Sequence, residues 1–394
     1  MAVGADLRQH NGARLHPGTG GPVLLLSMRK LANLAAYSLA YEFEDTVVEL
    51  TGADRVEAGD WDALELSRRA YKLTRFATGS RKMAARFAPK PSTVRLTRDY
   101  ELFFPAFNYA YELYSLATIP DWRKRCRVAV CFITESWPNR LPGYLLELLS
   151  EFDHVFSGHR HCVDDVARIV GKPCTYLPLA SNVLRFAPTP EALHARPIDV
   201  CNIGRRSQVT HAALLKLADA RKIFYYYDTV AASGAGNKQR TFRIDNPSEH
   251  RRLLASLLQR SRYYTANRSR VNEPEFTRGV DEISSRFYEG AAAGTVMIGV
   301  PPKNAEFARQ FDWQDAVIHL PFDSPDVAQI LAELNSNPQR LAAIRRNNVH
   351  YAAQRHDWGA RLRTVFDTVG IKPTDAMIER EDKLKTLAAR ILAA

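Results

Sequence analysis

The chain has 394 residues, more than a single hydrophobic core usually supports, so we expect two domains. The formal net charge of +11 favours anionic partners, but no zinc-finger, aromatic RNA-binding or recognition-helix pattern is present, so we expect no nucleic-acid partner. Five cysteines without a CxxC pair indicate neither a disulfide framework nor a zinc site.

Residues 1–21 are polar and glycine-rich, which predicts a loose tail rather than a signal peptide. The cysteines are expected to be reduced and buried, as in a cytoplasmic protein. A strand over 22–27, a helix over Met28–Phe43 and a short strand over 54–56 follow as a βαβ opening. Met28, Arg29 and Lys30 stand where a glycine-rich phosphate loop would be, so a dinucleotide-binding fingerprint is not supported.

A basic helix is predicted between Ala63 and Arg98, where ten lysines and arginines face a single acid, Glu65. Leucine and alanine residues recur at helical spacing within it. Such a helix either presents an ordinary solvated face or makes a peripheral contact with the inner face of an anionic membrane.

The clearest strand of the first half is 127–134, which delivers Glu135 at its carboxyl end. Ligands of open α/β sheets lie beyond such ends, so Glu135 is a candidate for acceptor contact or acid–base work. The alternative is a surface or interdomain carboxylate. The other expected elements of this half are strands at 100–104, 154–157 and 175–179 and helices at 106–117, 145–151 and 162–170.

Residues 185–196 contain two prolines and are predicted to form a linker, after which the α/β pattern restarts. The expected strands are 198–203, 223–227, 261–266 and 316–320, and the expected helices are 211–220, 248–259, 324–335 and 339–354. We therefore expect an N-terminal domain over 22–190, a C-terminal domain over 191–370 and a final helix over 371–394, with a flexible loop at 233–238.

The stretch from Arg278 to Pro302 is predicted to be a compact unit of loop, helix and buried strand. Ser284 or Ser285 can cap the helix, and Gly294 can end it. The helix N-terminus would then suit an anion. The plain alternative is an ordinary αβ unit with a surface pair between Arg286 and Glu289.

Three stretches from Tyr176 onward resemble the two-domain GT-B glycosyltransferases, most closely the family-four-like and spore-maturation-type group. Asp281, seven intervening residues and Glu289 resemble the acid-x7-acid motif, and Gly290 to Ile298 resemble the small-residue helix and strand after it. Ile203 to Arg206 resemble the glycine–arginine turn of the nucleotide-binding domain, and Tyr176 to Asn182 the segment before the linker.

The resemblance implies two Rossmann-like domains that face each other across a cleft, with the final helix crossing back to the first. It implies transfer of a sugar from a nucleotide-diphosphate sugar, without a metal or other cofactor and with retention of configuration. The donor would bind the C-terminal domain. An envelope, polysaccharide, lipid-linked or small-molecule acceptor would bind the N-terminal domain.

The resemblance also implies roles for individual residues. Glu289 would hold the ribose hydroxyls, and Asp281, which replaces the usual Glu, would contact the donor sugar. Arg205, after Gly204, would bind the diphosphate. The lysine that the family places about five residues later is missing, and the candidates to replace it are Arg206, Arg286 and His211. The amides after Ser284 and Ser285 would assist, and Glu135 and Asp281 are the candidate catalytic residues.

Two other functions remain open on the sequence. One is a non-catalytic nucleotide- or carbohydrate-binding module of the same fold. The other is a sugar-nucleotide epimerase.

Overall fold

A computed structural model describes residues 12–31, 34–59, 61–89, 91–137, 140–189, 191–193, 196–228, 232–233, 238–239 and 242–393. The chain forms two compact units. The first comprises residues 1–33 and 47–177, and the second comprises residues 34–46 and 178–394. Among the residues described, no helix has both the length and the apolar character that a bilayer crossing requires.

The first unit is built on an eight-stranded sheet. Its strands lie in the order β1 (Arg14–His16), β3 (Asp54–Glu57), β2 (Val23–Ser27), β4 (Tyr100–Phe103), β6 (Cys126–Ile133), β7 (His154–Ser157) and β8 (Cys174–Tyr176), and β5 (Ala106–Phe107) also pairs with β6. All pairs are parallel except that of β1 with β3. Strand β2 is buried along its whole length, as expected for a parallel sheet covered on both faces.

Helices connect these strands, and the sequence located several of them. They are α2 (Trp61–Thr78), α3 (Arg81–Phe87), α4 (Trp122–Arg125), α5 (Gly143–Leu146) and α6 (Val163–Val170), with 3-10 turns η2 (Ala110–Thr118), η4 (Glu147–Glu151) and η5 (Arg160–Cys162). Helix α6 ends at Gly171 with φ +70°, as predicted. The helix expected over 106–117 is instead β5 followed by η2, and β1 occupies three residues of the expected loose tail.

The first α-helix begins ten residues later than the sequence predicted. The amide of Leu31 donates to the carbonyl of Met28 (2.9 Å), which closes a turn after β2. The 3-10 turn η1 (Ala35–Tyr37) then leads into α1 (Ser38–Thr51). The amide of Ala35 donates to the carbonyl of Phe242 (2.9 Å), so this segment is fixed by a partner far away in the sequence.

The second unit contains a five-stranded, fully parallel sheet. The order is β10 (Tyr225–Tyr227), β9 (Ile198–Asn202), β13 (Ser261–Thr265), β14 (Val296–Gly299) and β15 (Ile318–His319). In chain order this is 2-1-3-4-5, the arrangement of doubly wound nucleotide-binding sheets. The order reverses between β9 and β13, and ligands of such sheets bind at that switch point.

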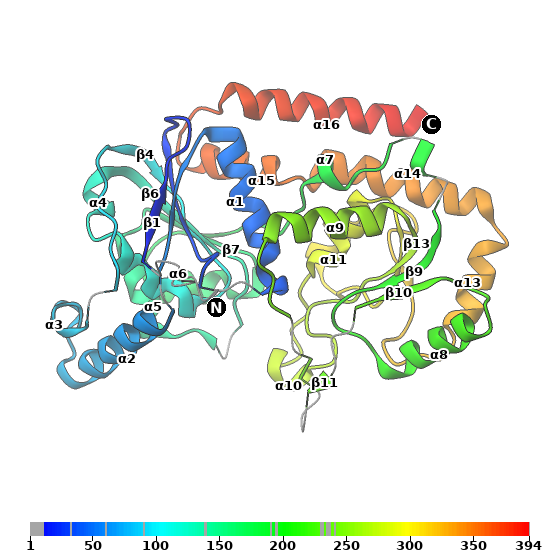
Figure 1. Cartoon of the computed structure of the whole chain (residues 1–394), viewed down its shortest axis with the longest axis horizontal. Coiled ribbons are helices and arrows are strands. Elements are labelled where there is room, and N and C mark those ends of the chain that lie inside the picture. Colours follow the sequence, from blue (N-terminus) through cyan, green and yellow to red (C-terminus); the bar gives the residue numbers. More distant parts are fainter. Residues whose placement is uncertain are drawn as a thin grey trace, which may run out of the picture. The chain divides into compact units, whose positions relative to one another are not determined.

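Helices surround this sheet (Figure 1). They are α7 (Val183–Phe186), α8 (Gln208–Asp219), α9 (Pro247–Gln259), α10 (Pro274–Thr277), α11 (Ser285–Ala292), α12 (Ala305–Gln310), α13 (Val327–Asn335), α14 (Pro338–Arg355), α15 (Trp358–Thr368) and α16 (Asp375–Ala393), with the 3-10 turn η6 (Glu191–Leu193). Helices α14 and α16 pack side by side. The two parallel α/β sheets confirm the predicted Rossmann-like fold class. A short hairpin, β11 (Ala232–Ser233) with β12 (Lys238–Gln239), flanks the expected loop at 233–238, most of which lies outside the described residues.

The predicted helix–strand unit of Arg278–Pro302 is present as α11 and β14. Gly290 lets α11 lie close to the sheet, because a Cβ there would stand 2.7 Å from Met297 Sδ. Gly294 follows the helix with φ +63°, as predicted. The predicted side-chain cap is wrong. Ser284 occupies the cap position, but its hydroxyl donates to the carbonyl of Asn267 (2.7 Å) and not to the helix amides.

Candidate active site

A pocket opens at the carboxyl ends of the strands of the second unit, at the switch point. We call it the switch-point pocket. It holds about 280 Å³ of unfilled space, part of it open to solvent, and its polar lining is Asn202, Arg205, Arg206, Ser207, Thr210, Thr265 and Asn267. Asn202 ends β9 and Thr265 ends β13, so the two strands that flank the reversal supply its floor.

The turn from Gly204 to Arg206 forms one wall of this pocket. Gly204 has φ +81°, and its amide donates to Asp228 Oδ2 (2.6 Å). Arg206 is buried and pairs with Asp228 Oδ1 (2.6 Å), so its charge is largely balanced inside the protein. Ser207 then caps α8 by accepting from the amide of Thr210 (3.2 Å).

Arg205 also has an acidic partner. Its guanidinium donates to Glu273 Oε1 (2.6 Å) and to Asn272 Oδ1 (2.7 Å). Burial alone would raise the pKa of Glu273, but hydrogen bonds from Arg205 and Arg270 outweigh burial and hold that pKa below its usual value. Glu273 is therefore ionised, and Arg205 is held in place while it lines the pocket.

Arg286 differs from these two arginines. It is half-buried on the first turn of α11, and its Nε donates to the carbonyl of Ile203 (3.2 Å). Its Nη2 lies against Gly204, where a Cβ would stand only 2.4 Å away. Among the described residues no carboxylate pairs with Arg286. Of the three predicted site arginines, it has the charge most available to a ligand.

His211 is a weak substitute for the missing lysine. Its Nδ1 lies 2.8 Å from the hydroxyl of Tyr225. Burial, and then the charge of Arg206, lower the pKa of His211 below its usual value. The imidazole is therefore neutral at physiological pH and adds no fixed charge.

Glu289 is buried and does not form the surface pair with Arg286. Its Oε1 accepts from Arg251 Nη1 (2.5 Å), and Arg251 Nη2 donates in turn to Glu42 Oε2 (3.0 Å). Oε2 of Glu289 has no hydrogen-bond partner among the residues that the structure describes, so it remains able to accept from a ligand. Glu289 lies one turn after Arg286 on the same face of α11.

The Glu42–Arg251–Glu289 cluster is a compact network of charges inside the second unit. Burial alone would raise the pKa of Glu42, but Arg251 and then Arg185 outweigh it and hold that pKa below its usual value. The indole of Trp358 also donates to Glu42 Oε2 (3.2 Å). The cluster fixes the guanidinium that orients Glu289.

Asp281 lies in the loop before α11. One of its oxygens pairs with Arg268 Nε (2.7 Å), and the other accepts from the amide of Lys303 (3.1 Å). Its backbone carbonyl accepts from Asn304 (2.7 Å). Both carboxylate oxygens are engaged, which suits a residue that holds the loop in position. Ser285, the first residue of α11, is partly exposed at that helix end.

Glu135 lies in the first unit, directly after β6. Its Oε2 accepts from the hydroxyl of Tyr109 (2.7 Å) and its Oε1 from the indole of Trp137 (2.6 Å). His159 lies edge-on to Trp137, and its Nδ1 is 2.7 Å from the carbonyl of Ser136. These contacts hold the partly exposed carboxylate of Glu135 in a fixed orientation at the carboxyl end of the sheet.

Sequence reasoning missed several residues of the switch-point pocket, among them Asn202, Thr265, Asn267 and Gly299. Asn202 and Thr265 are joined by a hydrogen bond (2.6 Å), and Asn267 Oδ1 accepts from the amide of Val300 (2.9 Å). The signal was available, because Asn202, Thr265 and Gly299 each stand one residue before the end of a predicted strand and Asn267 follows one directly. Polar residues at the carboxyl ends of the strands of a doubly wound sheet are the expected ligand contacts.

Two doubly wound units, one of which carries an arginine-lined pocket at its switch point, are the architecture of the GT-B class. A family model described as "Glycosyl transferase-like" matches residues 217–367, within the second unit. This match agrees with the resemblance and with the glycosyltransferase class predicted from short motifs, and the two parallel α/β sheets agree with the predicted fold.

Solved structures of this type are similar to the chain at low identity. HepE from Anabaena, solved in complex with UDP-glucose, has 11% identity over 88% of this chain and 99% of its own, with a TM-score of 0.47. TarM has 9% identity over 68% and 54%, with a TM-score of 0.42. MurG from Acinetobacter baumannii has 10% identity over 88% and 99%, with a TM-score of 0.39. No curated protein matches the sequence.

Proposed function

We propose that the chain transfers a sugar from a nucleotide-diphosphate sugar, bound in the switch-point pocket, to a carbohydrate or lipid-linked acceptor. The observation that carries this proposal is the position of Arg286, which bears no carboxylate partner among the described residues and lies against the Gly204 turn. A diphosphate placed between Arg286, Arg205 and the amides at the start of α8 would meet fixed positive charge from three directions.

In this proposal, the diphosphate leaving group is stabilised by guanidinium groups and helix amides. Negative charge grows on the oxygen that links the sugar to the diphosphate as that bond breaks. Donors held in place before the reaction stabilise such charge without reorganisation. Transfer then needs no metal ion. Retention of configuration is carried by the resemblance to the family-four-like group, and anomeric analysis of the product tests it.

Glu289 is proposed to bind the ribose through Oε2, while Arg251 holds Oε1. A carboxylate accepts two hydroxyl hydrogen bonds well, and the charged network behind it restricts its rotation. Asp281 is proposed to position the loop beside the donor sugar rather than to carry a proton. Glu135 is proposed to contact the acceptor, because hydrogen bonds from Tyr109 and Trp137 hold its carboxylate in a fixed orientation.

The experiment is to incubate the full chain with sugars of UDP, GDP, ADP and CMP and to measure nucleotide release, with Arg286→Met beside wild type. We expect release from one donor and a loss of about 100-fold in kcat/KM in the variant. Arg309→Met is the matched control, because Arg309 is exposed and pairs with Glu306 (2.5 Å) on α12. It should keep full activity.

No release from any donor would refute the proposal, as would full activity in Arg286→Met. Tight nucleotide binding without turnover would indicate a binding module instead. Isomerised nucleotide sugar in the absence of an acceptor would indicate an epimerase.

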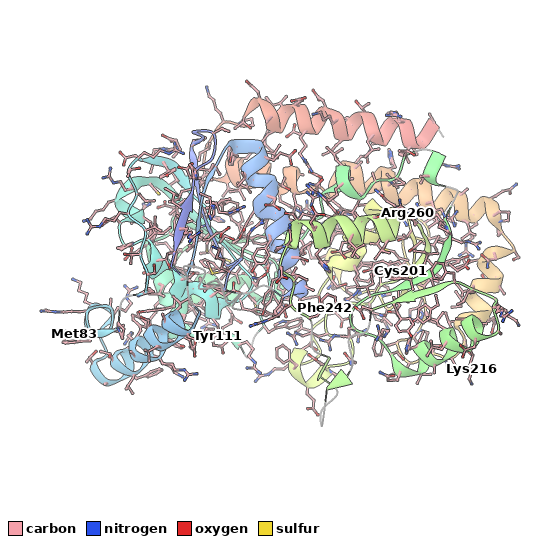
Figure 2. The ribbon with its side chains drawn as sticks, viewed as in Figure 1. Met83, Tyr111, Cys201, Lys216, Phe242 and Arg260 are labelled. Carbon is pink, nitrogen blue, oxygen red and sulfur yellow. The ribbon has the colours of Figure 1, made fainter. Side chains whose placement is uncertain are left out.

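We also propose that α2 and α3 touch anionic membrane, where a lipid-linked acceptor would be met. The inner face of these helices is anchored by buried Tyr71, by Arg68 on the hydroxyl of Tyr144 (2.7 Å) and by Arg75 on Glu147 (2.9 Å). The outer face exposes five large apolar side chains: Leu66, Leu73, Phe76, Met83 and Phe87. Figure 2 shows Met83 on α3, extending away from the ribbon.

Basic residues lie among these apolar side chains, including exposed Arg69, Lys72, Lys82 and Arg86. A solvated helix face would not need Leu73 at 74% and Phe76 at 70% exposure, whereas an interfacial helix uses both side-chain types. We expect the full chain to sediment with vesicles that contain anionic lipid and to be released by salt. Leu73→Ser with Phe76→Ser should remove this binding and keep donor hydrolysis. Unchanged sedimentation of that variant would refute the contact.

A further inference from the structure

A second pocket of the second unit lies at the opposite end of the sheet, where the strands begin. Arg196 lies two residues before β9, and Arg262 is the second residue of β13. These strand starts are adjacent, because Ile198 pairs with Ser261. Asn335, from the end of α13, and Arg345, from α14, complete the polar lining. We call this the arginine pocket, and it holds about 760 Å³ of unfilled space, part of it open to solvent.

The arginine pocket is separate from the switch-point pocket. The two lie at opposite ends of β9 and β13, and a five-residue strand is about 15 Å long. The arginine pocket shares no lining residue with the switch-point pocket.

Arg345 is a buried cation without a partner. Arg345 is only 7% exposed, and its Nε has no hydrogen-bond partner. Among the described residues no carboxylate or carbonyl accepts from its guanidinium. Burial, and then the charge of Arg262, lower the pKa of Arg345 below its usual value. A buried, unpaired guanidinium is unfavourable, so this position calls for an anion.

Arg196 adds a second uncompensated charge. It is also 7% exposed, and its guanidinium donates to the backbone carbonyls of Leu193, Leu258, Ser261 and Ala293. These carbonyls carry no net charge. Burial, and then the charge of Arg345, lower the pKa of Arg196 to about 9. The two buried arginines therefore repel each other, and an anion between them would relieve that repulsion.

The third arginine is fixed in place. Arg262 Nη1 pairs with Asp199 (2.9 Å), and Nη2 donates to Asn335 Oδ1 (2.7 Å), which also accepts from Tyr263 (2.6 Å). Asp199 is thus the only acid that an arginine of this pocket contacts among the described residues. The first turn of α14 lines the same pocket and adds the positive potential of a helix N-terminus.

We propose that the arginine pocket binds the phosphate group of a small anion, at a site distinct from that of the donor. Several guanidinium groups around one volume match a phosphate, which accepts bidentate hydrogen bonds. The volume exceeds that of a phosphate alone, and Pro338, Leu341 and Ala342 supply an apolar wall for an attached organic group. Binding there would favour the packed arrangement of α13, α14 and the strand starts.

The test compares the melting temperature of the full chain in millimolar inorganic phosphate and in sodium chloride of equal ionic strength. We expect phosphate to raise it, because a ligand that binds only the folded state stabilises that state. Arg345→Met should lose the phosphate effect, with affinity weakened at least ~10-fold. Arg346→Met, the next residue on α14 and outside the pocket, should keep it.

Arg345→Met is expected to fold, because it removes a buried unpaired charge and keeps an apolar stem of similar length. Arg286→Met should keep the phosphate effect, which separates this site from the donor site and from the fate of the proposed function. A phosphate monoester of a small polyol is the second arm. Tighter binding of the monoester than of phosphate, lost in Arg345→Met, identifies a phosphorylated metabolite, and equal binding identifies free phosphate.

Two results would overturn the proposal. One is a phosphate effect of the same size in wild type and Arg345→Met. The other is no effect of phosphate beyond that of chloride in wild type.

Discussion

Substitution of Arg251 should destabilise the second unit far more than substitution of the adjacent Arg252. Arg251→Met takes the cation away from two buried carboxylates, Glu42 and Glu289, and leaves Arg185 as the one cation that pairs with Glu42 among the described residues. Loss of one member of a buried pair costs about 3–5 kcal/mol, because the remaining charge stays desolvated. For a unit of about 230 residues this lowers the melting temperature by roughly 6–20 °C.

The effect should depend on pH with a defined sign. In wild type the pKa of Glu42 is held below its usual value of 4.5, so its contribution is present above that value and lost as the pH falls through the lower folded value. In Arg251→Met burial is largely unopposed and raises the pKa of Glu42. The destabilisation is then relieved by protonation, and the difference between variant and wild type shrinks as the pH falls from about 7.5 to about 5.

The assay is urea unfolding of both proteins at these two pH values. Arg252→Met is the control, because Arg252 is exposed and pairs on the surface with Glu249. It should change stability by no more than about 0.5 kcal/mol. A loss below about 1 kcal/mol in Arg251→Met, or a loss that is the same at both pH values, would refute the buried-network reasoning.

Three further predictions follow from the structure. Burial and then Arg361 lower the pKa of His356 to about 3, so the folded state should lose about 2 kcal/mol relative to the unfolded state as the pH falls from 7 to about 5. His356→Gln should flatten this pH dependence of stability in urea unfolding, and an unchanged pH dependence would contradict the prediction. Gly299→Ala should destabilise the protein severely and abolish donor binding in calorimetry, because the φ of Gly299 is +153° and a Cβ would stand 2.1 Å from the carbonyl oxygen of Ala266. Gly370→Ala, at φ +67° with open space around it, should cost about 1 kcal/mol of stability, and equal stability losses in the two variants would refute this. Glu135→Gln should lower kcat with acceptor while the donor Kd stays constant; a weakened donor Kd would contradict its acceptor role.

The sheets were predictable from sequence because buried parallel strands are short apolar runs between turns. Strands β2, β6, β9, β13 and β14 all lie within one or two residues of the expected ranges. Helix starts were harder to predict. Periodicity over Met28–Phe43 could not show that a turn follows Met28 and that the amide of Ala35 is fixed by Phe242, a contact across some 200 residues.

The candidate site was predicted as a set of residue types but not as a set of charge states. The sequence indicates Arg205 as the diphosphate ligand and Arg206 and Arg286 as candidates to replace the missing lysine, but it does not show which of these charges is free. The difference between them lies in partners such as Glu273 and Asp228, which approach only in the folded chain. In the same way, Glu289 reads as one half of a surface pair until Arg251 and Glu42 are placed beside it.

The position of Glu42 in the sequence has a consequence for synthesis of the protein. Residues 34–46 are made early, yet they belong to a unit in which Glu42 contacts Arg251 and Trp358, which are made about 200 and about 300 residues later. At typical translation rates roughly 15 to 60 seconds pass between the synthesis of Glu42 and that of Trp358. Until then residues 34–46 lack the partners that they have in the folded protein. The first unit must therefore fold around a segment that joins the second unit later.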